Sequence, residues 1–104
     1  MTYRKSWLLL VAVMFSCMFA LAHASDIFNG RKVYEMHCET CHGMDGRAIE
    51  PGVPDFSRGE ALYVPDVDLV QRLRDGDGHL PNYRGMLTDE ELRDVVAYIR
   101  TLQR

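Results

Sequence analysis

The stretch Cys38-Glu39-Thr40-Cys41-His42 decides how the rest of this chain is interpreted. Two cysteines separated by two residues and followed directly by a histidine have the spacing of a covalent attachment site for c-type haem. On one helical turn, Cys38 and Cys41 share a face, from which each sulfur can form a thioether to a haem vinyl carbon. His42 then lies against the iron and supplies a neutral imidazole as proximal ligand. The motif therefore predicts one covalently bound haem c with its iron.

A redox-active dithiol or a short disulfide is the alternative interpretation of the same motif, with His42 incidental. A thioredoxin-like dithiol requires a strand-helix-strand pattern around the two cysteines. No such pattern surrounds residues 38–42, because strand signals are weak along the whole chain and apolar residues recur at helical spacing instead. The sequence therefore favours haem attachment.

The first 24 residues have the pattern of an export signal. A charged start, Arg4-Lys5, precedes an uncharged apolar run over residues 7–21. Ala22-His23-Ala24 matches the small-x-small cleavage pattern, which would leave residues 25–104 as the mature chain. An uncleaved membrane anchor is the alternative, but the apolar run has only about fifteen residues where a span requires about twenty. We expect a cleaved signal peptide and export to the periplasm.

Removal of that segment would leave 80 residues with 10 basic and 15 acidic side chains, a net charge of −5 with histidines neutral. This balance argues against a nucleic-acid partner, because phosphate binding relies on clustered lysine and arginine. An acidic surface most often serves solubility, and the alternative is that it steers the protein to a basic docking face of a partner. Both cysteines of the mature chain belong to the motif, so the haem would complete the core of this small domain.

The first mature segment predicts a helix that is crossed by another helix. Ser25 or Asp26 can cap a helix that runs into the motif. Gly30 within that helix costs about 1 kcal/mol relative to alanine, so we expect a second helix to approach closely there. Met36 and His37, just before the motif, are expected to be a packing methionine and an exposed histidine.

Irregular and helical segments alternate over the rest of the mature chain. Residues 43–59 are rich in Gly, Pro and Asp and predict a loop wrapped over a cofactor edge. Asp66 can cap a short helix that stops at Gly76. Thr88-Asp89-Glu90-Glu91 is a capping box for a last helix that runs through to Arg104. The expected fold class is all-α, with the terminal helices packed together around one haem.

The mature region resembles the small monohaem class I cytochromes c. The residues that carry the resemblance are Gly30, Tyr34, Cys38-x-x-Cys41-His42-Gly43, Val53-Pro54-Asp55-Phe56, Leu87-Thr88-Asp89-Glu90-Glu91-Leu92 and Val95-Val96-Ala97-Tyr98-Ile99. The resemblance implies a cytochrome c domain over residues 25–104 with the class I fold. It also implies that Gly30 and Tyr34 pack against Val95 and Tyr98 of the last helix.

The same resemblance assigns roles to two residues of the middle loop. The family has a proline whose carbonyl oxygen accepts a hydrogen bond from the proximal histidine, and Pro54 stands where that residue is expected. Phe56 would then pack on the haem. A narrower similarity is to the small periplasmic cytochromes encoded among the nitrite reductase genes of denitrifying bacteria, which implies a periplasmic reductase as a redox partner.

The resemblance breaks at the sixth iron ligand. The family carries a methionine directly before a proline in the loop leading to the last helix, and this chain has Leu80-Pro81 there. Leucine cannot coordinate iron. Met86 would preserve His–Met ligation, which raises the reduction potential, whereas His79 would give a bis-histidine site. We assign His42 and Met86 as the metal ligands, with His79 and an open or water-bound iron as the alternatives.

These features together predict an exported electron carrier that cycles between Fe(III) and Fe(II) and passes electrons between donor and acceptor proteins. No catalytic triad pattern or phosphate-cradling glycine loop is present, so the chain is not expected to be an enzyme. Membrane association would follow only if residues 1–24 are retained. The alternative function is a ligand-binding or gas-sensing haem protein with an open sixth position, and Leu80 is the residue that favours it.

Overall fold

The computed structural model describes residues 3–18, 24–78 and 81–104, and the secondary structure of these residues is helical. The elements are the helices α1 (Tyr3–Met18), α2 (Ile27–His37), α3 (Glu39–His42), α4 (Asp66–Asp75) and α5 (Asp89–Thr101), with a 3₁₀ turn η2 (Phe56–Arg58). Within the described residues, extended pairing is limited to one isolated bridge between Arg84 and Leu87. The expected all-α fold class is confirmed.

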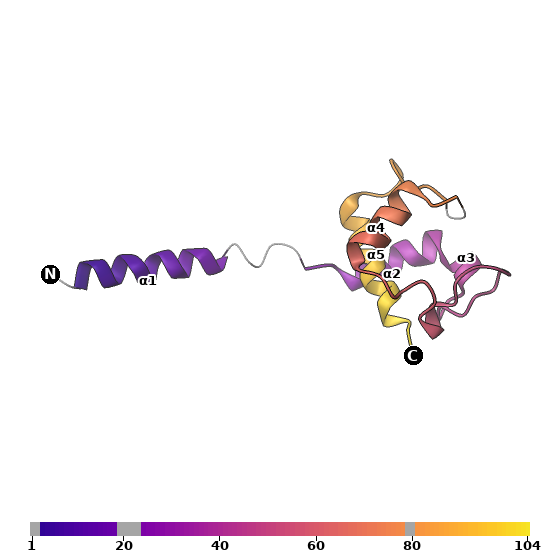
Figure 1. The fold of residues 1–104 in the computed structure, drawn as a ribbon, viewed down its shortest axis with the longest axis horizontal. Helices are drawn as coiled ribbons and strands as arrows, with labels where there is room; N and C mark the ends of the chain where they lie inside the picture. Colours follow the sequence, from indigo (N-terminus) through magenta and orange to yellow (C-terminus); the bar gives the residue numbers. More distant parts are fainter. Residues whose placement is uncertain (1–2, 19–23, 79–80) are drawn as a thin grey trace.

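Helix α1 lies apart from the group formed by the other helices (Figure 1). Its large apolar side chains, such as Trp7 and Phe15, are exposed. No helix in the described parts of the chain combines the length and the apolar character that crossing a membrane requires. Ala22 and His23 of the expected cleavage pattern lie outside the described residues. Removal of residues 1–24 therefore stays a prediction.

Helices α2 and α5, which lie far apart in the sequence, pack against each other (Figure 1). At the crossing, a Cβ atom on Gly30 would overlap the carbonyl oxygen of Asp94 and lie 3.0 Å from the Cβ of Tyr98. One turn further along α2, the ring of Tyr34 packs edge-on against Tyr98, with ring centroids 5.3 Å apart. The glycine is therefore required because it lets the two helix backbones meet, as expected.

The carboxylate of Asp94 fastens the start of α2 to α5. Asp94 is only 3 % exposed. It accepts hydrogen bonds from the backbone N–H of Asp26, at 2.7 Å, and from the side-chain amide of Asn29, at 2.9 Å. Asp26 in turn caps α2 by accepting from the backbone N–H of Phe28. A buried carboxylate at a helix N-terminus is satisfied both by these donors and by the helix dipole.

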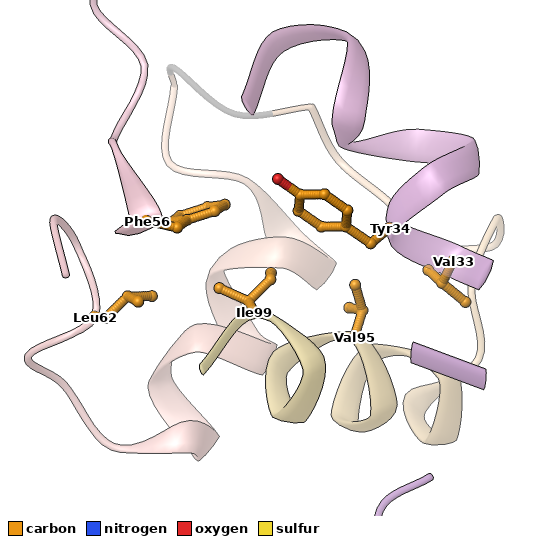
Figure 2. Packing of buried hydrophobic residues seen from close by; sticks show 6 residues of the cluster. All are labelled: Val33, Tyr34, Phe56, Leu62, Val95 and Ile99. Atoms are coloured by element: carbon orange, nitrogen blue, oxygen red, sulfur yellow. The ribbon is translucent and has the colours of Figure 1, made fainter. Parts of the chain in front are cut away.

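Two clusters of buried apolar residues form the core, and Figure 2 shows the first of them. The first cluster contains Val33, Tyr34, Phe56, Leu62, Val95 and Ile99. A second cluster, between α4, α5 and the loop that precedes α5, contains Val70, Tyr83, Leu92 and Val96. Helix α5 contributes to both clusters, so it is the element on which the other helices of the domain are assembled.

Two helix boundaries differ from those expected. The capping box of α5 is confirmed, because Thr88 and Glu91 exchange both side-chain to backbone hydrogen bonds. That helix ends at Thr101, however, before the expected Arg104. The expected cap at Asp66 is wrong. Pro65 occupies the N-cap position with an extended backbone, and Asp66 is the first helical residue. There the negative charge of Asp66 interacts favourably with the helix dipole.

Arg100 of α5 ties down the loop that leads into α4. Its guanidinium donates to the carbonyl oxygens of Leu62 and Val64, at 2.7 and 2.5 Å. The same group pairs with the carboxylate of Asp66 at 2.5 Å. These contacts hold an irregular segment in place that has few backbone hydrogen bonds of its own.

Candidate haem-binding site

A cavity of about 560 Å³ opens between the end of α2, the middle loop, α4 and α5. This volume lies in the range of cofactor sites, roughly 300–1,000 Å³. The five residues expected to bind the cofactor all line it, namely Cys38, Cys41, His42, Pro54 and Phe56. The fold thus brings the motif and the middle-loop residues to one place.

Helices α4 and α5 supply apolar wall residues that the sequence did not assign to the cofactor site. Leu69 and Leu73 of α4 and Val96 and Ile99 of α5 line the cavity. Their spacings of four and three residues place each pair on one helix face. That periodicity was the signal that could have identified them. An apolar wall of this kind suits the faces of a haem ring, because it removes their apolar surface from water.

The ring of His42 is oriented by a hydrogen bond at Nδ1. This nitrogen lies 3.1 Å from the carbonyl oxygen of Pro54. A carbonyl can only accept, so Nδ1 carries the hydrogen and Nε2 keeps the lone pair that binds a metal. Burial lowers the pKa of His42, and the hydrogen bond to Pro54 opposes that shift. The neutral imidazole, which is the form that binds iron, is therefore favoured.

Phe56 covers one face of the same imidazole. The rings of His42 and Phe56 are stacked, with centroids 4.2 Å apart and an angle of 11° between their planes. Phe56 was expected to pack on the haem. The structure places it in the cavity wall with its ring against the histidine.

Cys38 and Cys41 are not joined by a disulfide, and the first is half-buried while the second is exposed. Burial, together with the neighbouring Cys41, raises the pKa of the Cys38 thiol from an ordinary 9.0 to about 11. Both cysteines line the cavity, so both sulfurs can meet a cofactor that is bound there.

Met86 is not brought together with the other expected site residues. Its side chain is 63 % exposed and does not line the cavity. Its backbone N–H bonds to the carbonyl of Tyr83 in a tight turn, and Gly85 adopts a φ of 81° between them. Met36 and Met44 are also exposed and also absent from the cavity wall. His79 and Leu80 lie outside the described residues.

The expectations for Met36 and His37 were wrong. Met36 is 75 % exposed, whereas His37 is half-buried and lines the cavity. The reason is helical geometry, since His37 follows Gly30 by seven residues and so lies on the same side of α2. Tyr83 holds this end of α2, because its hydroxyl donates to the carbonyl of His37 at 3.3 Å and its ring packs edge-on against the imidazole.

A family model described as "Cytochrome C oxidase, cbb3-type, subunit III" matches residues 25–99. The chain belongs to this family of c-type cytochromes. Cytochrome c6 of Thermosynechococcus vestitus is 32 % identical over 83 residues, which cover 75 % of this chain and 71 % of that protein. Cytochrome c6 of Synechococcus elongatus is 31 % identical over 80 residues, which cover 72 % of this chain and 88 % of that protein.

Solved structures support the same fold. The cytochrome is similar to the KustC0563 c-type cytochrome, with a TM-score of 0.63, 26 % identity and coverage of 72 % of this chain and 98 % of that one. Cytochrome c6 from the diatom Phaeodactylum tricornutum has a TM-score of 0.62 at 21 % identity, over 74 % of this chain and 93 % of that one, and so shares the fold. The class I cytochrome c fold expected from the sequence is confirmed.

Membership of this family gives the cytochrome one covalently bound haem c with its iron, and a function in haem-based electron transfer rather than in enzymatic catalysis. The narrower similarity to cytochromes associated with nitrite reductase receives no support from these comparisons.

Proposed function

We propose that this cytochrome is an exported, periplasmic electron carrier that shuttles electrons between a donor and an acceptor protein. The observation that carries the proposal is the meeting of Cys38, Cys41 and His42 on the wall of one cavity, with Nδ1 of His42 bonded to the carbonyl of Pro54. This arrangement offers two sulfurs for thioethers and one imidazole nitrogen for iron. The comparisons favour this carrier over a gas-sensing haem protein.

Each residue of the site has a distinct part in holding the cofactor. The haem, when bound, supplies a one-electron Fe(III)/Fe(II) couple. Cys38 and Cys41 hold it covalently, and His42 is its proximal ligand. Pro54 keeps the His42 imidazole in the tautomer that exposes Nε2. The apolar side chains of α4 and α5 exclude water, which tunes the potential through the local dielectric.

Arg72 is the cation in the described part of the cavity wall, alongside the acidic Asp77. Haem carries two carboxylate groups, and a guanidinium matches a carboxylate in charge and shape. We infer that Arg72 of α4 balances this charge. In contrast to Arg74 and Arg100, which pair with Asp89 and Asp66, Arg72 has no ion pair with the residues described.

Carbon monoxide binding distinguishes three possibilities for the sixth position of the iron, which are Met86, His79 and an open position. Met86 remains our proposed ligand, and it would have to turn inward through the hinge offered by Gly85. We expect the optical spectrum of the dithionite-reduced holoprotein to be unchanged by carbon monoxide, because a firm sixth ligand excludes it. Replacing Met86 with alanine should then permit rapid and complete binding of carbon monoxide, whereas His79→Ala should not.

The opposite pattern in the two variants would transfer the assignment to His79. A rapid and complete spectral shift in the unmodified protein would mean an open iron, and would replace the carrier proposal with gas binding. Lys32→Ala on the exposed side of α2 serves as the control, because Lys32 does not line the cavity.

Charge steering of the redox partner is tested with small oxidants. The mature net charge of −5 should attract a cationic complex such as tris(1,10-phenanthroline)cobalt(III) and repel anionic ferricyanide. Raising the ionic strength from about 10 to 150 mM shortens the screening length several-fold. We expect the second-order rate constant to fall with salt for the cationic oxidant and to rise for the anionic one, measured by stopped-flow. Flat rate constants for both would remove charge steering from the proposal.

A further inference from the structure

We propose that Phe56 is a positioning residue for the proximal ligand, whose ring fixes the plane of the His42 imidazole in the holoprotein. This inference rests on the proposed role of His42 as iron ligand. It assigns Phe56 a contact with the histidine, in place of the general role in the haem wall that the sequence suggested.

The stack is close and nearly parallel. The ring centroids are 4.2 Å apart, the planes differ by 11°, and Phe56 is 8 % exposed. An imidazole turns easily about its last side-chain bond, since such torsions have broad minima. The hydrogen bond to Pro54 restrains that rotation only in part, because a hydrogen bond tolerates a wide range of angles. A ring lying flat against the imidazole removes the remaining freedom.

The backbone that carries Phe56 is itself held in place. The N–H of Phe56 donates to the carbonyl of Gly46 at 2.8 Å. Asp55 caps η2 by accepting from the N–H of Arg58 and the hydroxyl of Ser57. Pro54 and Phe56 thus belong to one ordered segment. This segment contacts His42 twice, through the carbonyl of Pro54 and through the ring of Phe56.

Figure 2 shows Phe56 beside Leu62 and Ile99, at the edge of the first cluster. The position lets one side of the ring join the core while the other covers His42. Val33 of α2 offers a matched comparison, because it is 6 % exposed and belongs to the same cluster but does not line the cavity. The stacking contact, however, is made by Phe56.

The plane of an axial imidazole determines which iron d orbitals it overlaps, and therefore how unpaired spin spreads over the haem of the ferric protein. The shifts of the haem methyl resonances in the proton NMR spectrum report this distribution directly. A role in packing alone would change the stability of the protein without changing that pattern.

The test compares ferric holoproteins saturated with cyanide, so that every sample has the same sixth ligand. We expect Phe56→Leu, which keeps an apolar side chain but removes the ring, to change the order and spread of the haem methyl shifts. Phe56→Tyr, which keeps the ring, should restore the pattern of the unmodified protein. Val33→Ala should lower the melting temperature while leaving the pattern unchanged.

An unchanged pattern in Phe56→Leu would overturn the inference, as would an equal change in Val33→Ala. Failure of the proposed function is a separate result. In that case the unmodified chain would yield no covalently bound haem, or a cyanide complex that lacks the signals of a coordinated imidazole.

Discussion

A chain in which both Cys38 and Cys41 are replaced by serine is expected to retain no covalent haem after denaturation. A serine hydroxyl does not form the thioether, and the remaining ligand contact through His42 is reversible. The haem would also complete the core of the expected 80-residue mature domain, and domains of this size bury little surface by themselves. We therefore expect near-complete loss of haem staining after denaturing electrophoresis, and an intact mass without haem.

Thr40→Ser is the matched control, because it lies between the two cysteines and leaves both sulfurs in place. Its intact mass should include one haem. The same measurement reports whether residues 1–24 have been removed, since the expected mature chain begins at Ser25. Covalent haem in the double serine variant would contradict the proposed attachment site.

Alanine at Gly30 is expected to destabilise the holoprotein by about 3 kcal/mol, the upper end of the usual cost of overpacking. The added Cβ would overlap the Asp94 carbonyl oxygen and lie 2.5 Å from its carbon. These atoms belong to the backbone of α5 and cannot move aside as a side chain would. Without the crossing helix, alanine at this position would stabilise α2 by about 1 kcal/mol relative to glycine. A loss of stability in this variant therefore indicates that α5 contacts α2 at Gly30.

Thermal and denaturant unfolding of the ferric holoprotein measures this change in free energy. Lys32→Ala, on the exposed side of the same helix, should alter stability by no more than about 0.5 kcal/mol. If Gly30→Ala raised the melting temperature, α2 and α5 would not meet at this residue. A stability equal to that of the Lys32 variant would lead to the same conclusion.

Local patterns predicted the parts of this fold whose causes are local. The capping box of Thr88 and Glu91 needs only residues three apart, and it forms as expected. Gly30 is a costly residue in a helix, and the reason for its presence, the approach of α5, could be inferred without coordinates. The motif of Cys38 and His42 is likewise complete within a single turn of helix.

Features that depend on tertiary contact were harder to predict. Whether Met36 or His37 faces the cavity depends on how α2 is rotated about its own axis. A rotation by one residue would turn Met36 toward the cavity in place of His37. No sequence feature indicated a role for Arg72 in the cofactor site, because a long cationic side chain on a short helix is ordinarily solvated. The stack of Phe56 on His42 joins two elements whose relative position follows only from the folded loop.

The sixth ligand illustrates the same limit. Sequence spacing shows that Met86 follows the usual family position by six residues, but it does not show where a turn through Gly85 directs the side chain. Met86 is exposed in the structure, so its sulfur can bind iron only if the turn through Gly85 changes when iron is present. Carbon monoxide binding answers this directly.

The anchoring of the loop by Arg100 bears on how fast electrons can move. An electron carrier reacts most readily when its two oxidation states share nearly the same geometry, because each transfer must supply the energy of any rearrangement. The loop that contains Leu62 forms part of the cavity wall, yet it has little secondary structure to keep it rigid. Two contacts from Arg100 attach it to α5, the same helix that supports both apolar clusters, and a third contact attaches the first residue of α4. We expect these contacts to keep the wall in one shape as the charge on the iron changes, which corresponds to a small reorganisation energy.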